Sequence, residues 1–239
     1  MKYEVFDDPD SVARAGARRI AAEARQAVAS RGRFSLAVSG GRTPWIMLRA
    51  LAAEDVPWAG VHIFQVDERI APQGDPDRNL THLRDSLLAH APLDAEQIHA
   101  MPVESSDWEA GAQQYAAVLR AITGSPAILD LVHLGLGPDG HTASLVPGDP
   151  ALQIENADVA VTGVYQGRHR MTLTYPVLDG ARSLLWIVTG GEKQEMFKRL
   201  IAGDPSIPAG RVRSDNAVLL ADRAATGERS ARSGGMGRQ

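Results

Sequence analysis

Apolar residues in this chain gather in short runs, and most segments between the runs carry apolar residues at helical spacing. The runs predict strands at residues 2–6, 33–38, 61–66, 97–103, 131–136, 158–164, 170–174, 183–189 and 218–220. The helical spacing predicts helices at residues 11–29, 79–90, 107–122 and 193–202, a helix capped by Thr43, and a short helical turn at residues 176–181. Strands that alternate with helices are typical of a mostly parallel sheet flanked by helices. We therefore predict a single α/β domain, doubly wound and Rossmann-like.

Composition narrows the class of protein. The 239 residues suffice for one large domain. The formal net charge of −4 does not indicate a surface that binds nucleic acid, which would be basic. The absence of cysteine excludes disulfides, thiol nucleophiles and thiolate metal sites. No apolar run approaches the ~20 residues needed to cross a bilayer, and the acidic start MKYEVFDDPD is unlike a signal peptide. We expect a cytoplasmic, monomeric enzyme without nucleic-acid or membrane partners.

The last residues differ in composition from the rest of the chain. Residues 225–239 hold too few apolar side chains to build a packed structure. We therefore predict a domain at residues 1–224 and a disordered tail at residues 225–239.

The most informative stretch is residues 130–150, DLVHLGLGPDGHTASLVPGDP. Its apolar run passes into three glycines, which are Gly135, Gly137 and Gly140. In open α/β folds, such strand ends lie at the edge of the sheet where ligands bind. Asp139 and His141 follow on a backbone that glycine lets approach a ligand closely. A carboxylate and an imidazole on a tight turn predict a site that moves protons.

The same stretch also matches a dinucleotide-binding pattern. Residues 135–140 spell G-x-G-x-x-G after a strand, and Asp158 lies roughly 20 residues further on, as that pattern requires. Pro138, however, removes a backbone donor that a pyrophosphate would need. Asp158 also precedes the next apolar run instead of ending it. A nicotinamide site is therefore a disfavoured alternative that the sequence leaves open.

Two glycine-bearing junctions between strands and helices are typical of anion-binding sites. The first follows the strand at 33–38 and consists of Ser39, Gly40, Gly41, Arg42 and Thr43. Its backbone N–H groups, hydroxyls and helix N-terminus converge on one spot. The second follows the strand at 183–189 and consists of Gly190, Gly191, Glu192 and Lys193. Together they predict a phosphate site, with ordinary strand-to-helix turns as the alternative.

Charged residues mark two further strand ends. Asp67-Glu68-Arg69 follows the strand at 61–66, where it either holds a ligand or is merely exposed to solvent, and the tripeptide alone does not decide. Arg168 and Arg170 flank the start of another strand, and one of these cations is expected to face the ligand. Two anion sites, two acidic strand ends and an imidazole together suit a sugar phosphate.

Five motifs in these regions resemble those of the 6-phosphogluconolactonases of the pentose phosphate pathway. They are SGGRTP (39–44), VDERIAP (66–72) with Asn79, GLGPDGHTASLVPG (135–148), RMTLTYP (170–176) and TGGEKQ (189–194). The motifs occur in the family's order and span about residues 38–225. The resemblance implies hydrolysis of a small sugar phosphate lactone, 6-phospho-D-glucono-1,5-lactone, to 6-phospho-D-gluconate, with no metal and no organic cofactor.

The resemblance also implies roles for individual residues. His141 is expected to take a proton from the attacking water, since histidine side chains titrate near neutral pH. Asp139 would either orient that imidazole or stabilise the charge that forms on it, and Asp67 would hold substrate hydroxyls. The residues expected to bind the substrate and its phosphate are Ser39, Gly40, Gly41, Arg42, Thr43, Arg69, Asn79, Arg170 and Lys193. Ser144 lacks the G-x-S-x-G surroundings of a nucleophile and is expected to be structural.

Two other functions must be distinguished from this one. Glucosamine-6-phosphate deaminases resemble this chain at Asp67, Asp139 and His141, but they read G-H-I-A-F-N-E-P where this chain reads GHTASLVP. Val146 stands in place of the glutamate that partners their histidine, and a valine cannot transfer a proton. A sugar-phosphate sensor without turnover is the second alternative, although a sensor needs neither His141 nor Asp139.

Overall fold

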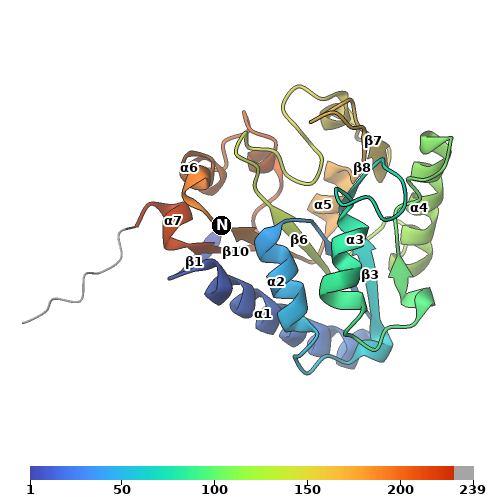
Figure 1. The fold of residues 1–239 in the computed structure, drawn as a ribbon, viewed down its shortest axis with the longest axis horizontal. Helices are drawn as coiled ribbons and strands as arrows, with labels where there is room; N and C mark the ends of the chain where they lie inside the picture. The colour runs from blue at the N-terminus through green and yellow to red at the C-terminus, as the bar shows by residue number, and fades with distance from the viewer. Residues whose placement is uncertain (229–239) are drawn as a thin grey trace, which may run out of the picture.

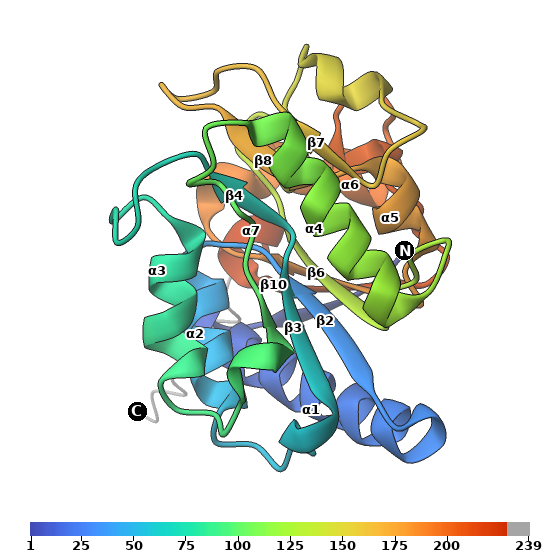
Figure 2. The same cartoon turned by 90° about the vertical axis from the view of Figure 1, so that its right-hand side faces the viewer.

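A seven-stranded parallel sheet in the order β1-β10-β9-β6-β2-β3-β5 crosses the centre of the molecule (Figures 1 and 2). The computed structural model describes residues 1–228. The strands of this sheet are β1 (Lys2–Phe6), β2 (Phe34–Val38), β3 (Val61–Gln65), β5 (Ile98–His99), β6 (Leu131–Gly135), β9 (Ser183–Val188) and β10 (Ala217–Asp222). The first and last of them pair with each other along the edge, from Lys2 opposite Val218 to Phe6 opposite Asp222.

A second, antiparallel sheet of three strands begins where β3 ends. Its strands, in the order β4-β8-β7, are β4 (Asp67–Arg69), β7 (Val159–Val161) and β8 (Arg170–Leu173). Asp67 lies opposite Thr172, and Arg69 lies opposite Arg170. The charged tripeptide after β3 is therefore a paired strand, which the pattern of apolar residues does not predict.

Helices cover both faces of the main sheet, so the doubly wound α/β prediction is confirmed. They are α1 (Pro9–Arg31), α2 (Arg42–Leu51), α3 (Asn79–Leu83, continued by a π-helical turn at Arg84–Leu88), α4 (Trp108–Thr123), α5 (Tyr175–Gly180), α6 (Gln194–Ile201) and α7 (Arg223–Thr226). Buried residues of α1, α2 and α3 form one apolar core, and those of α4, α5 and α6 form another on the opposite face. In α1, a side chain at Gly16 would lie 2.6 Å from Met47 Sδ, so glycine lets α1 and α2 pack closely.

The strand order reverses between β2 and β6, and open α/β folds bind their ligands at such a reversal point. From β2 the sheet extends through β3 to β5, and from β6 it extends through β9 and β10 to β1. At the reversal point, the loops that follow two adjacent strands run in opposite directions. They leave a crevice between them, outside the carboxyl ends of those strands. The glycine-bearing loops that follow β2, β6 and β9 all begin at this edge.

Several element ends differ from the sequence predictions. Helix α1 begins two residues earlier than predicted, because the Asp8 side chain accepts a hydrogen bond from the Ser11 N–H at 2.7 Å and caps the helix. Helix α2 begins at Arg42 and is capped by Gly41, whose φ of 135° turns the chain before Thr43 is reached. The strand predicted at 97–103 shortens to β5, because the Met101 N–H donates to the Gln65 side chain at 2.9 Å instead of continuing the sheet.

The folded part of the chain extends past the boundary predicted at residue 224. Helix α7 spans Arg223–Thr226, is capped by the Asp222 side chain and buries Ala225 completely. The rest of the tail predicted at 225–239 lies largely outside the described residues, from 229 onward. Within residues 1–228, none of the helices has both the length and the apolar character that a bilayer crossing requires.

Candidate active site

A cavity of about 480 Å³ opens at the reversal point of the main sheet. Eleven of the residues predicted for the site line it, namely Ser39, Gly40, Gly41, Arg42, Thr43, Asp67, Arg69, Asn79, His141, Arg170 and Lys193. Two sets of elements bring them together. The parallel wall consists of the loops after β2, β6 and β9 (residues 39–43, 135–141 and 189–193). The antiparallel wall consists of Asp67, Arg69 and Arg170 from the second sheet and Asn79 from the start of α3.

His141 and Asp139 form a hydrogen-bonded pair on the loop after β6. Asp139 Oδ1 lies 2.6 Å from His141 Nδ1 and also accepts from the His141 backbone N–H at 3.2 Å. Asp139 is not a lining residue, so it holds the imidazole from behind. Partial burial would raise the pKa of Asp139, but the charge and N–H groups of His141 and the Tyr165 hydroxyl outweigh it and lower that pKa. With Nδ1 engaged, Nε2 is the nitrogen available to a ligand.

Glycine at position 137 is a steric requirement of this pair. A Cβ at Gly137 would lie 2.1 Å from His141 Nδ1 and 2.7 Å from Asp139 Oδ1. The Gly137 N–H donates to the His141 carbonyl at 2.8 Å, and the Gly140 N–H donates to the Gly137 carbonyl at 3.1 Å. These two backbone N–H groups are therefore engaged within the loop, where they hold His141 in position.

The same loop argues against a dinucleotide site. Two of the amides that would cradle a pyrophosphate are already bonded within the turn, and no α-helix follows this loop within residues 136–174. Asp158, which would bind a ribose in that pattern, instead forms an ion pair with Arg120 at 2.6 Å.

At the junction after β2, glycine residues place the backbone itself against the cavity. A Cβ at Gly40 would lie 2.1 Å from Asn79 Oδ1, so only glycine fits beside that side chain. Ser39 is buried, and its hydroxyl donates to the His133 carbonyl at 3.0 Å. The Ser39 hydroxyl is therefore already engaged as a donor. The Thr43 hydroxyl lies 2.7 Å from that of Thr189, which links the junctions after β2 and β9.

Two cations lie on the parallel wall. Arg42 is exposed at the start of α2, and Lys193 is half-buried in the 3₁₀ turn that precedes α6. Burial lowers the pKa of Lys193, an effect that Glu192 and Asp139 partly oppose. An ammonium group that is costly to bury gains from a bound anion, as a phosphate would be.

Arg170, rather than Arg168, faces the cavity. Arg168 forms ion pairs with Asp75 and Asp77 in the loop before α3, at 2.9 and 3.1 Å. The Arg170 side chain is 5% exposed, lines the cavity, and its Nε has no hydrogen-bond partner within the described residues. Burial lowers the pKa of Arg170 from its ordinary value.

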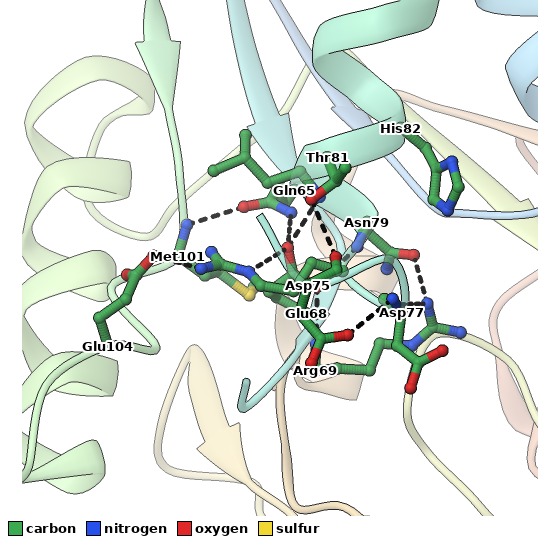
Figure 3. Close-up of polar contacts among 12 residues, drawn as sticks. Gln65, Glu68, Arg69, Asp75, Asp77, Asn79, Thr81, His82, Met101 and Glu104 are labelled. Atoms are coloured by element: carbon green, nitrogen blue, oxygen red, sulfur yellow. Dashed lines mark hydrogen bonds and ion pairs between the residues drawn. The ribbon is translucent and has the colours of Figure 1, made fainter. Parts of the chain in front are cut away.

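A buried carboxylate supports the antiparallel wall from behind (Figure 3). Glu68 is fully buried and accepts hydrogen bonds from the backbone N–H groups of Arg69, Asn79 and Leu80 at 2.7–2.8 Å, and from Gln65 Nε2 at 2.9 Å. It also lies 3.4 Å from Nε of Arg78, whose side chain is 1% exposed. Sequence reasoning treated Glu68 as part of a charged strand end, because nothing local indicates burial.

These contacts align the polar groups of the antiparallel wall. The Asn79 side-chain NH₂ donates to the Asp67 carbonyl at 2.9 Å, and its oxygen accepts from Arg69 Nη1 at 2.9 Å. The Ser144 hydroxyl donates to Asp67 Oδ2 at 2.5 Å, and Ser144 is completely buried. Its hydroxyl is thus a structural support for Asp67, in agreement with the sequence analysis.

Tyr165 is a site residue that sequence reasoning missed. Its hydroxyl donates to Asp139 Oδ2 at 3.0 Å, and its ring meets the edge of His141 and the guanidinium of Arg170. The only signal in the sequence is the turn-forming Gln166-Gly167 pair that follows it. Within residues 1–228, no group of three or more histidine, aspartate or glutamate side chains is placed to hold a metal ion.

Comparison with known proteins identifies relatives over most of the chain. A family model described as glucosamine-6-phosphate isomerases/6-phosphogluconolactonase matches residues 7–220. A 6-phosphogluconolactonase of Synechocystis sp. is 38% identical over 181 residues, which cover 74% of this chain and 75% of the relative. The 6-phosphogluconolactonase of Thermotoga maritima has a similar structure, with a TM-score of 0.83, 24% identity and coverage of 92% of this chain and 98% of that one.

A deaminase has the same fold. A monomeric glucosamine-6-phosphate deaminase superposes with a TM-score of 0.83 at 18% identity, over 96% of this chain and 100% of that one. At that identity the likeness concerns the fold alone, so the fold does not choose between the two activities. Individual residues of the site must make that choice.

Proposed function

The chain belongs to the glucosamine-6-phosphate isomerase/6-phosphogluconolactonase family, and we propose that it hydrolyses 6-phospho-D-glucono-1,5-lactone with a water molecule that His141 activates. The observation that carries this proposal is the Asp139–His141 pair, 2.6 Å apart, beside a cavity flanked by Arg42, Arg170 and Lys193. A general base must lie within reach of the proton that it takes, and His141 is the lining residue that combines this position with a suitable side chain.

The proposed reaction begins with proton removal from water. Asp139 accepts the Nδ1–H of His141, so Nε2 carries the lone pair that takes the proton as the water oxygen attacks the lactone carbon. The bond between that carbon and the ring oxygen then breaks. The imidazolium returns the proton to the ring oxygen, which leaves as a hydroxyl group of the open-chain acid. The acid ionises, so each turnover releases one proton.

Developing charge on the carbonyl oxygen needs a donor. The Gly137 and Gly140 amides are bonded within their loop, which leaves Arg170 as our choice for this role. We assign Asp67, Arg69 and Asn79 to the sugar hydroxyls. Since a lactone is an activated ester, one base and an electrostatic pocket suffice, and the scheme uses neither a metal nor a covalent nucleophile.

The phosphate is assigned to the parallel wall. The residues proposed to bind it are Gly40, Gly41, Arg42, Thr43 and Lys193, whose backbone N–H groups, hydroxyl and cations are the donors that a phosphate prefers. Ser39 belongs to the same junction, where it supports the backbone through its bonds to His133.

Two observations separate this function from its alternatives. Val146, which stands where deaminases carry a glutamate, is buried and is not a lining residue of the cavity. A sensor would not require an imidazole fixed by both a carboxylate and a sterically obligatory glycine. We further propose a monomer that acts in the cytoplasm, in line with the acidic composition and the absence of cysteine.

The decisive experiment measures proton release from fresh lactone in a pH-stat, with the spontaneous rate subtracted. His141→Ala should lower kcat by a factor of about 10² to 10⁴, the usual worth of a general base. His90→Ala, at an exposed histidine just after the π-helical turn, is the matched control and should keep its activity. A His141→Ala enzyme with more than half of the wild-type rate would refute the mechanism. Ammonia release from glucosamine 6-phosphate by the wild type would favour the deaminase instead.

A further inference from the structure

Tyr165 is held in place by a tight hairpin. Its N–H donates to the Arg168 carbonyl at 2.9 Å, and the Arg168 N–H returns a bond of 3.3 Å. Gln166 and Gly167 between them both have positive φ, 51° and 80°, which is the pattern of a type I′ turn. The Arg168 ion pairs with Asp75 and Asp77 fasten this hairpin to the loop before α3. The backbone of Tyr165 therefore has a fixed position relative to the antiparallel wall of the cavity.

The Tyr165 hydroxyl completes the contacts of the Asp139 carboxylate. Oδ1 accepts from His141, and Oδ2 accepts from the Tyr165 hydroxyl at 3.0 Å. With two hydrogen bonds on Oδ1 and one on Oδ2, the carboxylate cannot rotate without breaking at least one of them. Partial burial and the nearby Asp139 charge raise the pKa of Tyr165, so its hydroxyl stays protonated and remains a donor at neutral pH.

The Tyr165 ring touches two further groups of the site. The guanidinium carbon of Arg170 lies 4.9 Å from the ring centroid, within the range of a cation–π interaction. The His141 ring meets it at 5.4 Å with an angle of 68° between the ring planes. One side chain thus contacts the proposed base, its carboxylate and the buried cation of the antiparallel wall.

We propose that Tyr165 is a positioning residue for the hydrolysis proposed above, on which this inference rests: its hydroxyl holds the Asp139–His141 pair, and its ring holds Arg170. It is not among the residues that line the cavity, so it acts through its neighbours. Loss of the hydroxyl alone should impair the chemical step and leave substrate binding intact. Loss of the whole ring should also release Arg170.

The chain contains a matched control for the tyrosine chemistry. Tyr175 places its ring 4.8 Å from the guanidinium carbon of Arg211, and its hydroxyl donates to the Pro208 carbonyl at 2.9 Å. It is also outside the cavity lining. Tyr175→Phe therefore removes one tyrosine hydrogen bond beside one cation, as Tyr165→Phe does, but away from the site.

The first test compares kcat, KM and melting temperature for the two phenylalanine variants. Tyr165→Phe should lower kcat about tenfold, the loss expected for one hydrogen bond to a charged group, with KM within twofold of wild type. Tyr175→Phe should change neither constant beyond twofold. Tyr165→Leu should lower kcat further than Tyr165→Phe does, because Arg170, the donor proposed for the carbonyl oxygen, also loses its support. A Tyr165→Phe kcat within twofold of wild type, or an equal loss in Tyr175→Phe, would overturn the proposal.

A second test does not depend on turnover. The Nδ1–H proton of His141, identified by its disappearance in His141→Gln, should give a slowly exchanging downfield NMR signal in the wild type. In Tyr165→Phe this signal should broaden through exchange with water, and in Tyr175→Phe it should persist. An unchanged signal in Tyr165→Phe would overturn the proposal. If the wild type does not hydrolyse the lactone, the proposed function fails, and this measurement still decides whether Tyr165 holds the pair.

Discussion

On the parallel wall of the cavity, glycines bring the backbone itself close to the cavity. On the antiparallel wall, buried charged side chains fix the positions of the residues that line the cavity. Gly40 and Gly137 leave no room for a side chain beside Asn79 and His141. On the other side, Glu68 and Arg78 lie in the interior and bind the segments that carry Arg69 and Asn79. One wall depends on steric exclusion and the other on paired charge, so damage to them should have different consequences.

The largest expected effect is on the stability of the antiparallel wall. Glu68→Ala leaves four N–H donors unpaired in the interior and removes the buried carboxylate beside Arg78 Nε, and breaking a buried pair in this way costs ~3–5 kcal/mol of the free energy of unfolding. Glu104, which contacts the same Arg78 from an exposed position, is the matched control, and Glu104→Ala should cost less than ~1 kcal/mol. Urea denaturation measures both. Equal losses in the two variants would mean that the buried Glu68 contributes no more to stability than the exposed Glu104 does.

The next effect is on activity and concerns the parallel wall. Gly137→Ala should displace the His141 imidazole, and a misplacement of ~1 Å at a reacting group costs about 10²-fold in rate. The melting temperature should change little, because the loop is at the surface of the cavity. Gly180→Ala, at the end of α5, is the control, since the atom nearest to the added methyl is the Ala127 carbonyl oxygen at 3.6 Å. A fully active Gly137→Ala enzyme would contradict the steric account.

A smaller effect should separate phosphate binding from chemistry. Lys193→Ala and Arg42→Ala should each raise KM for the phosphorylated lactone roughly tenfold to a hundredfold, because charge-assisted hydrogen bonds are worth ~1.5–3 kcal/mol. The value of kcat should change less, since the phosphate is bound equally in substrate and transition state. Kinetics with plain glucono-1,5-lactone supply the control substrate, and Lys198→Ala on the exposed face of α6 supplies the control variant. Equal damage toward both lactones would remove these residues from the phosphate site.

The smallest effect is a pH dependence of stability that comes from a histidine in β6, next to the parallel wall. His133 in β6 is completely buried, and burial lowers its pKa to about 3. Below the ordinary histidine pKa of about 6.5, His133 is protonated in the unfolded chain but stays neutral in the folded chain. The free energy of unfolding therefore falls as the pH falls. This contribution amounts to ~1.4 kcal/mol per pH unit.

Denaturant titrations between pH 6 and 4 measure this slope. His133→Asn should be less stable than wild type at neutral pH, but its stability should fall less steeply with acid by about that amount. His90→Asn, at an exposed position, should keep the wild-type slope. Parallel curves for wild type and His133→Asn would show that the buried imidazole does not resist protonation.

The two walls also differed in how far the sequence could predict them. The strand, glycine and helix signals of the parallel wall lie within a few residues of one another, as in Ser39–Thr43, so local rules suffice to place it. The antiparallel wall depends on pairing between β4 and β8, strands about a hundred residues apart. No period of apolar residues encodes that pairing. The sequence left open whether Glu68 holds a ligand or is exposed, and it did not indicate burial, because that burial is decided by donors from Gln65, Asn79 and Leu80.

Side-chain partnerships were also beyond the sequence. The prediction that His141 and Asp139 act together followed from their spacing of two residues, whereas Tyr165 reaches the same carboxylate from a separate hairpin. Likewise, the choice between Arg168 and Arg170 required the position of Asp75 and Asp77, which neutralise one of the two. The hydrogen bond that the Ser39 hydroxyl donates to the His133 carbonyl could not be predicted from the sequence either.

The pairing of β1 with β10 bears on the order of events during biosynthesis. Residues 2–6 lie beside residues 218–222, so β1 is synthesised before its partner strand, which follows 216 positions later, from 2 to 218. Contacts of such long sequence separation form late and slow the approach to the native state. Meanwhile β1 has an unpaired edge, and its exposed Lys2 and Glu4 are the kind of charged residues that discourage pairing with other chains. The loops after β2, β6 and β9 that line the cavity can therefore form before β1 pairs with β10.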